Sequence, residues 1–266
     1  MKYNNLYPPL VQRINHESAN VKSPEKAAKT RLHQLYGAYI SPNSNKKAKA
    51  IIEKLSSQAD GLKSGSTDGI SENINQLLKL HASTHERLPY YIDFYKYIFD
   101  KTGPVSTVLD LGCGYNPFSL PYYPCKINKY HAIDIDMQTR DLLNAYFDLI
   151  GLPKLAYCAD LALYNPKMDV DLTLMLKLFP VLCQASPDRA AGLANGLCTK
   201  WLVITFPTKS LGGRKKGMYE NYRESFFVAL NKNTLENFTL ISENQVGSEL
   251  VFILRRQYQR MKTSAV

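Results

Sequence analysis

The segment VLDLGCG, residues 108–114, is an apolar run that ends in a glycine turn. A buried strand followed by such a turn is typical of the edge where an open parallel sheet binds a nucleotide-like ligand, because glycine lets the backbone approach the ligand closely. On its own the GxG pattern also fits an ordinary strand-to-helix turn. The interpretation therefore depends on the residues that follow.

Two acids follow at the ends of the next apolar segments. Asp134 lies 24 residues after Asp110, and Asp160 ends the third segment. We expect the first carboxylate to accept both ribose hydroxyls of a cofactor and the second to accept from its adenine amino group. Position 117 is proline where a dinucleotide fingerprint has glycine, which disfavours NAD. The glycine turn and the two acids therefore predict S-adenosyl-L-methionine as the cofactor and methyl transfer as the chemistry.

Short apolar segments alternate with helical ones, which predicts a largely parallel sheet covered on both faces. The expected strands are residues 105–111, 130–135, 155–158, 172–176, 201–206, 239–243 and 250–254. The last two are close in sequence and are expected to be antiparallel. This is the α/β architecture of a class I S-adenosylmethionine-dependent methyltransferase, with a Rossmann-like seven-stranded sheet.

The first part of the chain has a different pattern. Residues 1–80 predict a small helical N-terminal domain, and residues 81–266 predict the methyltransferase domain. Ser23 as a cap and Pro24 at the first helical position predict a helix that continues towards Tyr39.

Further helices are expected at residues 45–58 and 70–80. Ser83 and Glu86 have capping-box spacing and predict one more helix, which Pro89 should kink or shift.

The net charge of +10 is unevenly distributed along the 266 residues. Residues 1–54 carry +7, residues 55–199 carry −3 and residues 200–266 carry +6. Two basic regions around an acidic middle suit a polyanion held at two places, although solvated lysines of an ordinary soluble protein are the alternative.

The composition also excludes several classes of protein. The chain has no apolar run of the roughly 18 residues that a membrane span needs and no hydrophobic leader, so we expect a soluble, cytoplasmic protein. The five cysteines lack metal-ligand spacing, so no metal site is expected.

The residues after the fourth expected strand constrain the methyl acceptor. They read LKLFP, residues 176–180, where enzymes that methylate exocyclic amines usually have an Asn/Asp-Pro-Pro-aromatic motif. Cys183 is expected to be a packed structural thiol rather than the nucleophile for carbon-5 methylation. Guanine N7 has an in-plane lone pair and no proton to lose, so alignment with the methyl group suffices without a general base. Guanine N7 is therefore the favoured acceptor.

Several stretches, in order and over nearly the whole chain, resemble the aminoglycoside-resistance 16S rRNA (guanine-1405) N7-methyltransferases. They are LHQLYGAY at 32–39, HASTHER at 81–87, GCGYNP at 112–117, LKLFP at 176–180, FPTKSLGGR at 206–214, KGM at 216–218 and GSEL at 247–250. The chain departs from the family's usual pattern at Lys209, where arginine is commoner, and at Pro89.

The resemblance implies a helical domain that docks on the 30S ribosomal subunit and methylation of a decoding-site guanine, which blocks aminoglycosides such as gentamicin and kanamycin. It also implies that Arg87 pairs with the carboxylate of the cofactor and that Tyr39 reaches over from the N-terminal domain. The expected cofactor-binding residues are Tyr39, His81, Ala82, Ser83, Arg87, Gly112, Gly114, Asp134, Asp160, Leu161 and Leu176.

Two residues are assigned to the acceptor side. Lys177 lies beside the expected methyl-transfer point and should hydrogen-bond guanine O6 or a phosphate, and Met218 should make an apolar contact with a flipped nucleotide. The residues expected to contact RNA phosphates are Lys26, Lys29, Arg31, Lys46, Lys47, Lys49, Lys209, Arg214, Lys215 and Lys216.

Two alternatives stay open. One is methylation of adenine N1 at the same decoding site, and the other is a non-catalytic RNA-binding ribosome factor on a methyltransferase fold. The glycine turn and both acids argue against the second. The expected partner is the 30S subunit, with no membrane partner, and the protein is expected to be a monomer.

Overall fold

The computed structural model describes residues 3–57, 68–185, 187–208, 220, 223–224, 226 and 235–257. Its centre is a seven-stranded sheet in the order β3-β2-β1-β4-β5-β7-β6. The strands are β1 (Thr107–Leu111), β2 (Lys129–Asp134), β3 (Ala156–Cys158), β4 (Asp169–Leu176), β5 (Cys198–Pro207), β6 (Phe238–Val246) and β7 (Glu249–Arg256).

The strands β1 to β5 pair in parallel, and β7 is antiparallel to both β5 and β6. The predicted strands are all present, and the closing pair is antiparallel as predicted. The class I α/β fold is confirmed.

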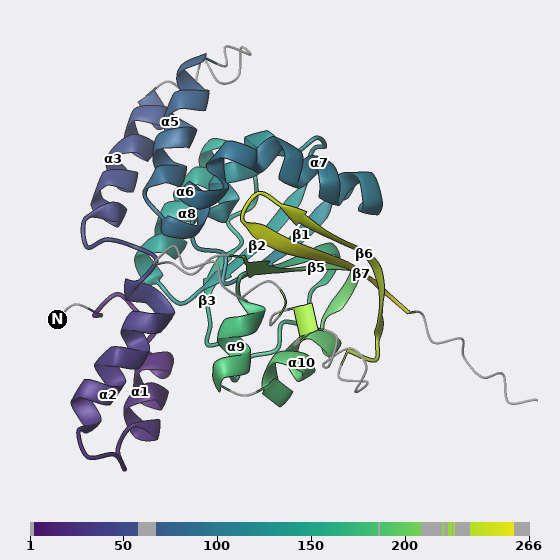
Figure 1. Cartoon of the computed structure of the whole chain (residues 1–266). Helices are drawn as coiled ribbons and strands as arrows, with labels where there is room; N and C mark the ends of the chain where they lie inside the picture. The colour runs from purple at the N-terminus through teal and green to yellow at the C-terminus, as the bar shows by residue number, and fades with distance from the viewer. Residues whose placement is uncertain are drawn as a thin grey trace, which may run out of the picture.

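Helices cover both faces of the sheet (Figure 1). One face carries α9 (Phe179–Ala185) and α10 (Pro187–Asn195). The other carries α3 (Ser44–Ser57), α5 (Asp68–Lys79), α7 (Tyr91–Thr102) and α8 (Met137–Leu149). Successive residues of a central strand point to opposite faces of the sheet and so belong to two hydrophobic cores. In β4, Leu172 and Leu174 lie in the core on one face and Met175 lies in the core on the other.

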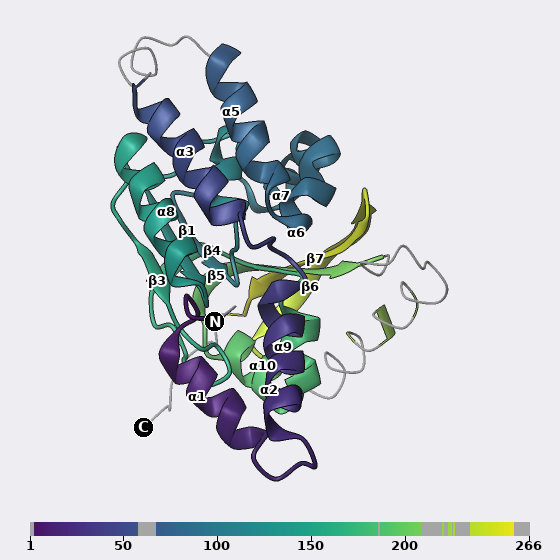
Figure 2. The same ribbon diagram turned by 90° about the vertical axis from the view of Figure 1, so that its left-hand side faces the viewer.

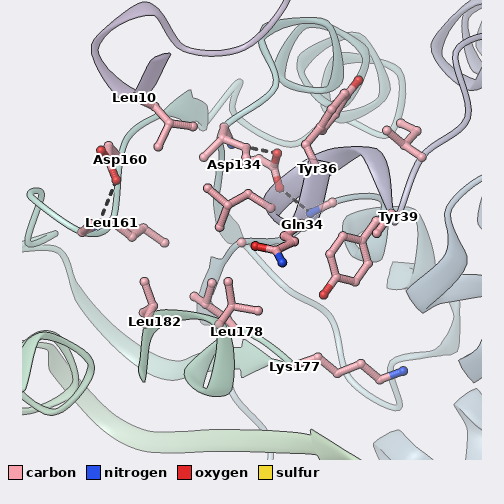
Figure 3. Close-up of a pocket in the computed structure, with 18 of the residues that line it drawn as sticks. Leu10, Gln34, Tyr36, Tyr39, Asp134, Asp160, Leu161, Lys177, Leu178 and Leu182 are labelled. Atoms are coloured by element: carbon pink, nitrogen blue, oxygen red, sulfur yellow. Dashed lines mark hydrogen bonds between the residues drawn. The ribbon is translucent and has the colours of Figure 1, made fainter. Parts of the chain in front are cut away.

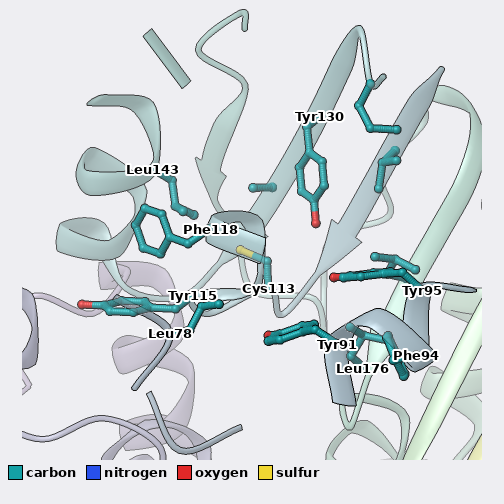
Figure 4. Close-up of a cluster of buried hydrophobic side chains, with 14 of the residues drawn as sticks. Leu78, Tyr91, Phe94, Tyr95, Cys113, Tyr115, Phe118, Tyr130, Leu143 and Leu176 are labelled. Carbon is teal, nitrogen blue, oxygen red and sulfur yellow. The ribbon is translucent and has the colours of Figure 1, made fainter. Parts of the chain in front are cut away.

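Helices α3 and α5 share the hydrophobic core of the methyltransferase sheet. Leu77 and Leu78 of α5 are fully buried and belong to the same cluster as Val108 of β1. Leu78 lies beside Tyr115, the residue that follows the glycine turn, in the cluster shown in Figure 4. The boundary we expected at residue 80 therefore crosses a continuous core, and a separate role for residues 1–80 stays a prediction.

Among the described residues, α1 (Pro8–Glu17) and α2 (Pro24–Leu32) pack around a small hydrophobic cluster separate from the two cores of the sheet. It contains Leu6, Leu10, Ile14, Ala28 and Leu32, all buried. These two helices project from the rest of the chain (Figure 2).

The link between α1 and the sheet is made by the backbone. The amide of Tyr7 donates to the carbonyl of Ile135 at 2.8 Å. The amide of Met137 donates to the carbonyl of Asn5, also at 2.8 Å. Between them, the buried carboxylate of Asp136 accepts from the Asn45 side chain at 2.7 Å and from the Tyr36 hydroxyl at 3.1 Å. The segments before and after residue 40 are thus both fixed to the start of α8.

Within the first 40 residues, the helices differ from the sequence predictions in two places. No helix was predicted at α1. The helix at Pro24 begins as predicted, but the Ser23 side chain makes no capping hydrogen bond, and the α-helix ends at Leu32 before a π-helical turn at His33–Gly37. Residues 58–67, between α3 and α5, lie outside the described residues.

The predicted capping box at Ser83 and Glu86 is wrong. Helix α6 (Ala82–Arg87) starts two residues earlier, with His81 instead of Ser83 at its N-cap, and the Glu86 carboxylate bonds to Lys177. Pro89 lies in the 3-10 turn Leu88–Tyr90 that separates α6 from α7, so the predicted break is confirmed.

Candidate functional site

A cavity of about 480 Å³ lies at the carboxyl ends of β1, β2 and β4, covered by α1, α2 and the segment that follows them (Figure 3). Its lining includes nine of the predicted cofactor-binding residues: Tyr39, His81, Ser83, Gly112, Gly114, Asp134, Asp160, Leu161 and Leu176. Lys177 lines the same cavity. Segments up to about 140 residues apart in the sequence therefore lie around one cavity, and the role of these residues in cofactor binding stays a prediction.

The glycine turn is required by geometry. Gly112 and Gly114 have positive φ angles of 63° and 48°. A Cβ atom at Gly112 would lie 2.9 Å from the Leu178 side chain, and one at Gly114 would lie 2.7 Å from the His81 ring. Larger residues are excluded by backbone conformation and by space alike, so the backbone itself forms this wall.

Asp134 at the end of β2 holds the turn in place. Its carboxylate accepts from the amides of Gly114 at 2.8 Å and Ile135 at 2.7 Å. Burial raises the pKa of Asp134 to about 6, although these amides counteract the increase. A carboxylate has about four lone-pair sites, so acceptor capacity remains for a ligand in the cavity.

Asp160 is paired with a residue that the sequence analysis missed. Arg13 of α1 donates to it from Nε at 2.6 Å and from Nη2 at 3.2 Å, and also lines the cavity. The other side of Arg13 bonds Glu17 at 2.7 Å, and Glu17 in turn pairs with Arg31 at 2.8 Å. This chain of ion pairs fixes α1 and α2 over the cavity.

His81 forms an aromatic wall of the cavity between two tyrosines. Its ring stacks on Tyr39 at 6.0 Å and on Tyr115 at 5.6 Å between centroids. Burial, together with the neighbouring positive charges of Arg87 and Lys177, lowers the pKa of His81 to about 3. The imidazole is therefore neutral at physiological pH. Tyr39 lines the cavity as well, and its contact with a cofactor stays a prediction.

Ala82 and Arg87 do not line the cavity. The amide of Ala82 donates to the carbonyl of Tyr39 at 2.8 Å, which joins the N-terminal segment to α6. Arg87 is 1% exposed, and its guanidinium bonds the carboxylate of Glu249 at 2.8 and 3.0 Å and the side chain of Asn116 at 3.0 Å. Direct contact between Arg87 and a cofactor carboxylate stays a prediction.

Lys177 follows β4 and has a positive φ of 58°, which a non-glycine residue rarely adopts. Its side chain is buried, and Nζ donates to Glu86 Oε2 at 2.6 Å. Strained backbone of this kind is concentrated at functional sites. The side chain lies beside Tyr39 in Figure 3, at the end of the cavity away from Asp160.

Comparison with known proteins identifies the family. The model of the family described as "Ribosomal RNA methyltransferase (FmrO)" matches residues 1–252. The chain belongs to this family of ribosomal RNA methyltransferases. A relative from Serratia marcescens, named 16S rRNA (guanine(1405)-N(7))-methyltransferase, is 33% identical over 259 residues, which cover 96% of this chain and 94% of the relative. A relative of the same name from Micromonospora echinospora is 30% identical over 263 residues, with 96% and 92% covered.

Solved structures agree with the assignment to the ribosomal RNA methyltransferase family. The 16S rRNA methyltransferase RmtF, crystallised with S-adenosyl-L-homocysteine, superposes with a TM-score of 0.81 at 31% identity and covers 96% of this chain and 94% of its own. The 16S rRNA methylase RmtB gives a TM-score of 0.76 at 27% identity, with 96% and 93% covered. The family resemblance that the motifs indicated is confirmed.

The predicted RNA contacts divide into two groups. Lys26 and Lys29 on α2 and Lys46, Lys47 and Lys49 on α3 are exposed. Arg31 is half-buried and lines the cavity. Its ion pair with Glu17 already neutralises part of the charge that a phosphate contact would need.

Five predicted site residues lie outside the described residues: Lys209, Arg214, Lys215, Lys216 and Met218. Their roles stay predictions. Among the described residues, no group of three or more His, Cys, Asp and Glu side chains is arranged to hold a metal ion. No helix in the described part of the chain is long and apolar enough to cross a membrane.

Proposed function

We propose that this ribosomal RNA methyltransferase transfers the methyl group of S-adenosyl-L-methionine to N7 of guanine 1405 in the 16S rRNA of the 30S subunit. The observation that carries this proposal is the cavity, in which nine predicted cofactor-binding residues and Lys177 meet beneath the N-terminal helices. The names of the relatives support the choice of base.

The cavity fits this cofactor through its backbone and its acids. Gly112 and Gly114 line the cavity without side chains, so a ligand there would lie directly against the backbone of the turn. Asp134 would accept from the ribose hydroxyls, and Asp160 from the adenine amino group. The neutral, aromatic side of His81 and Tyr39 would lie against the sulfonium end of the cofactor.

When bound, the cofactor supplies an electrophilic methyl group on a positively charged sulfur. The bond between methyl and sulfur breaks as the N7 lone pair forms the new bond, and the positive charge moves to the guanine ring. No proton is lost, so the protein needs to orient N7 rather than to deprotonate it. Lys177 would donate a hydrogen bond to guanine O6 or to a neighbouring phosphate and so fix the base.

The N-terminal helices would hold the substrate. Five exposed lysines on α2 and α3 would neutralise phosphates of 16S rRNA, and the basic residues of 209–218 would bind the RNA backbone near the target base. We propose that residues 1–80 act as the docking part and that the enzyme works in the cytoplasm, as a monomer and without a metal ion. Methylation of this guanine would block aminoglycosides that bind the decoding site.

The test is to map the methyl group. Purified 30S subunits are incubated with the protein and cofactor, and nuclease fragments of the 16S rRNA are analysed by mass spectrometry. We expect one added methyl in the fragment that contains guanine 1405. A methyl on a neighbouring adenine would support the N1 alternative, and binding of the subunit without methylation would support a non-catalytic factor.

A further inference from the structure

The motif GSEL, residues 247–250, is part of the family resemblance, but no function described above uses it. Its acid, Glu249, is the first residue of β7 and is 0% exposed. The carboxylate accepts from Arg87 Nε at 2.8 Å, from Arg87 Nη2 at 3.0 Å and from Thr205 Oγ1 at 2.7 Å. Lys177 Nζ lies 3.6 Å from the same carboxylate.

The charge of Glu249 is stabilised by two cations. Burial alone would raise the pKa of Glu249, but Arg87 and Lys177 outweigh it and the pKa is lowered. Glu249 is therefore a carboxylate that can only accept hydrogen bonds. Its position beneath Lys177 places a fixed negative charge at the acceptor end of the cavity.

The hydroxyl of Thr205 connects the Glu249 carboxylate with the backbone amide of Lys177. Thr205 is 0% exposed, and its one proton is donated to Glu249. The lone pairs of the hydroxyl are thus directed elsewhere, and the amide of Lys177 donates to this oxygen at 3.0 Å. The same amide is also 3.1 Å from the carbonyl of Thr205.

This contact occurs where the chain is strained. Lys177 has a φ of 58°, so its left-handed conformation needs surrounding interactions to hold it. Glu249 orients Thr205, Thr205 holds the amide of Lys177, and Glu86 and Glu249 hold its ammonium. Each end of Lys177 is therefore fixed by groups that lie outside the cavity lining.

We propose that Glu249 and Thr205 are positioning residues that hold Lys177 in its left-handed conformation, with its ammonium at the methyl-transfer end of the cavity. The proposal rests on the proposed function, in which Lys177 orients the guanine. A purely structural role of the buried Arg87–Glu249 ion pair is the alternative that the test must separate.

The decisive variant is Thr205→Val, which keeps the shape of the side chain but removes the hydroxyl. It leaves both charges of the Arg87–Glu249 pair in place. Thr205→Ser restores the hydroxyl. The matched control is Thr173→Val on β4, because Thr173 is also 0% exposed and its hydroxyl has no hydrogen-bond partner.

We expect Thr205→Val to lower the methylation rate at saturating cofactor and 30S subunit by about 10- to 100-fold, since small misplacements of positioning groups have effects of this size. The dissociation constants for cofactor and subunit should remain within about twofold of wild type. Thr205→Ser and Thr173→Val should keep the wild-type rate. Adding Thr205→Val to Lys177→Ala should cause no further loss, because the two changes act through one group.

A second measurement does not depend on methylation. Lys177 is 9% exposed, so an amine-reactive reagent mapped by mass spectrometry should label it slowly in the wild type and in Thr205→Ser. It should label Lys177 several times faster in Thr205→Val, while melting curves show the variant folded. Unchanged labelling and an unchanged rate in Thr205→Val would overturn the positioning role, as would equal losses in Thr173→Val. A wild-type protein that methylates no rRNA would contradict the proposed function, whereas the labelling result would still decide whether Thr205 and Glu249 position Lys177.

Discussion

Asp134 connects the glycine turn with the cavity, because the same carboxylate accepts from the Gly114 amide and lines the cavity. Its pKa is raised to about 6 by burial, so a fall in pH through this value adds a proton in the protein without ligand. A protonated carboxyl loses acceptor capacity, and the ribose hydroxyls need an acceptor.

We therefore predict that the affinity for S-adenosyl-L-methionine falls as the pH is lowered from 7 to 5. Asp134→Asn should weaken binding by about 1 to 3 kcal/mol at pH 7, the range for hydrogen bonds to a charged group. Calorimetric titrations at several pH values measure both effects. Asp110 also has a pKa raised to about 6 by burial, but it bonds Asn116 and Tyr130 instead of lining the cavity. If the pH dependence were equally steep in Asp134→Asn, the effect would belong to Asp110.

We predict that replacing Arg87 lowers the stability of the fold, whatever its effect on cofactor binding. Arg87→Ala leaves the fully buried Glu249 without its main partner, which should lower the free energy of unfolding by about 3 to 5 kcal/mol. The control is Arg140→Ala, whose exposed pair with Asp141 should contribute about 0 to 1 kcal/mol. Urea unfolding measures both. A destabilisation by Arg87→Ala no larger than that of the control would show that the buried pair is not needed for the fold.

At the scale of the element, α1 is held by few contacts. Its cluster with α2 is small, and the pair between Arg13 and Asp160 is its one side-chain ion pair to the sheet among the described residues. Helix α3, in contrast, lies in the main core. Local opening of α1 should therefore cost much less free energy than opening of α3.

Arg13→Gln is predicted to speed hydrogen exchange of the α1 amides while leaving those of α3 unchanged. The carboxylate of Asp160 loses its bidentate partner, and nothing of equal strength replaces it along this helix. Mass spectrometry of exchanged peptides measures the two helices in one sample. Lys29→Gln removes an exposed pair on α2 and is the matched control. Equal exchange of α1 in wild type and Arg13→Gln would mean that backbone contacts alone hold the helix.

Part of the site could be predicted from the sequence. The glycine turn, Asp134 and Asp160 were predictable because each lies at the end of a strand or within two residues of it, and parallel strands end at one edge of the sheet. Arg13 and Glu249 were not assigned a role, since their partners lie 147 and 162 residues away and no local pattern connects them. The capping box failed because Glu86 finds Lys177, a tertiary partner that the local spacing does not reveal.

At the scale of the whole molecule, we expect the positive charge of the exposed lysines to contribute to binding of the 30S subunit. The exposed lysines lie on α2 and α3 and none of them lines the cavity, so docking and cofactor binding should be separable by mutation. Charge reversal of Lys26, Lys29, Lys46, Lys47 and Lys49 should weaken 30S binding and flatten its dependence on salt, because counterion release scales with the number of phosphate contacts. Cofactor affinity should not change. Pull-down of 30S subunits at several salt concentrations tests this, and unaltered binding would show that these lysines are merely solvated.

The central claim is that one guanine in the assembled subunit is the acceptor. The direct measurement is transfer of a radiolabelled methyl group from S-adenosyl-L-methionine to three substrates: intact 30S subunits, naked 16S rRNA, and 30S subunits in which guanine 1405 is replaced by adenine. We predict incorporation approaching one methyl per intact subunit and background counts with the other two substrates. Equal incorporation into naked rRNA would contradict the docking role of the N-terminal helices, and equal incorporation into the replaced subunits would contradict the choice of guanine 1405.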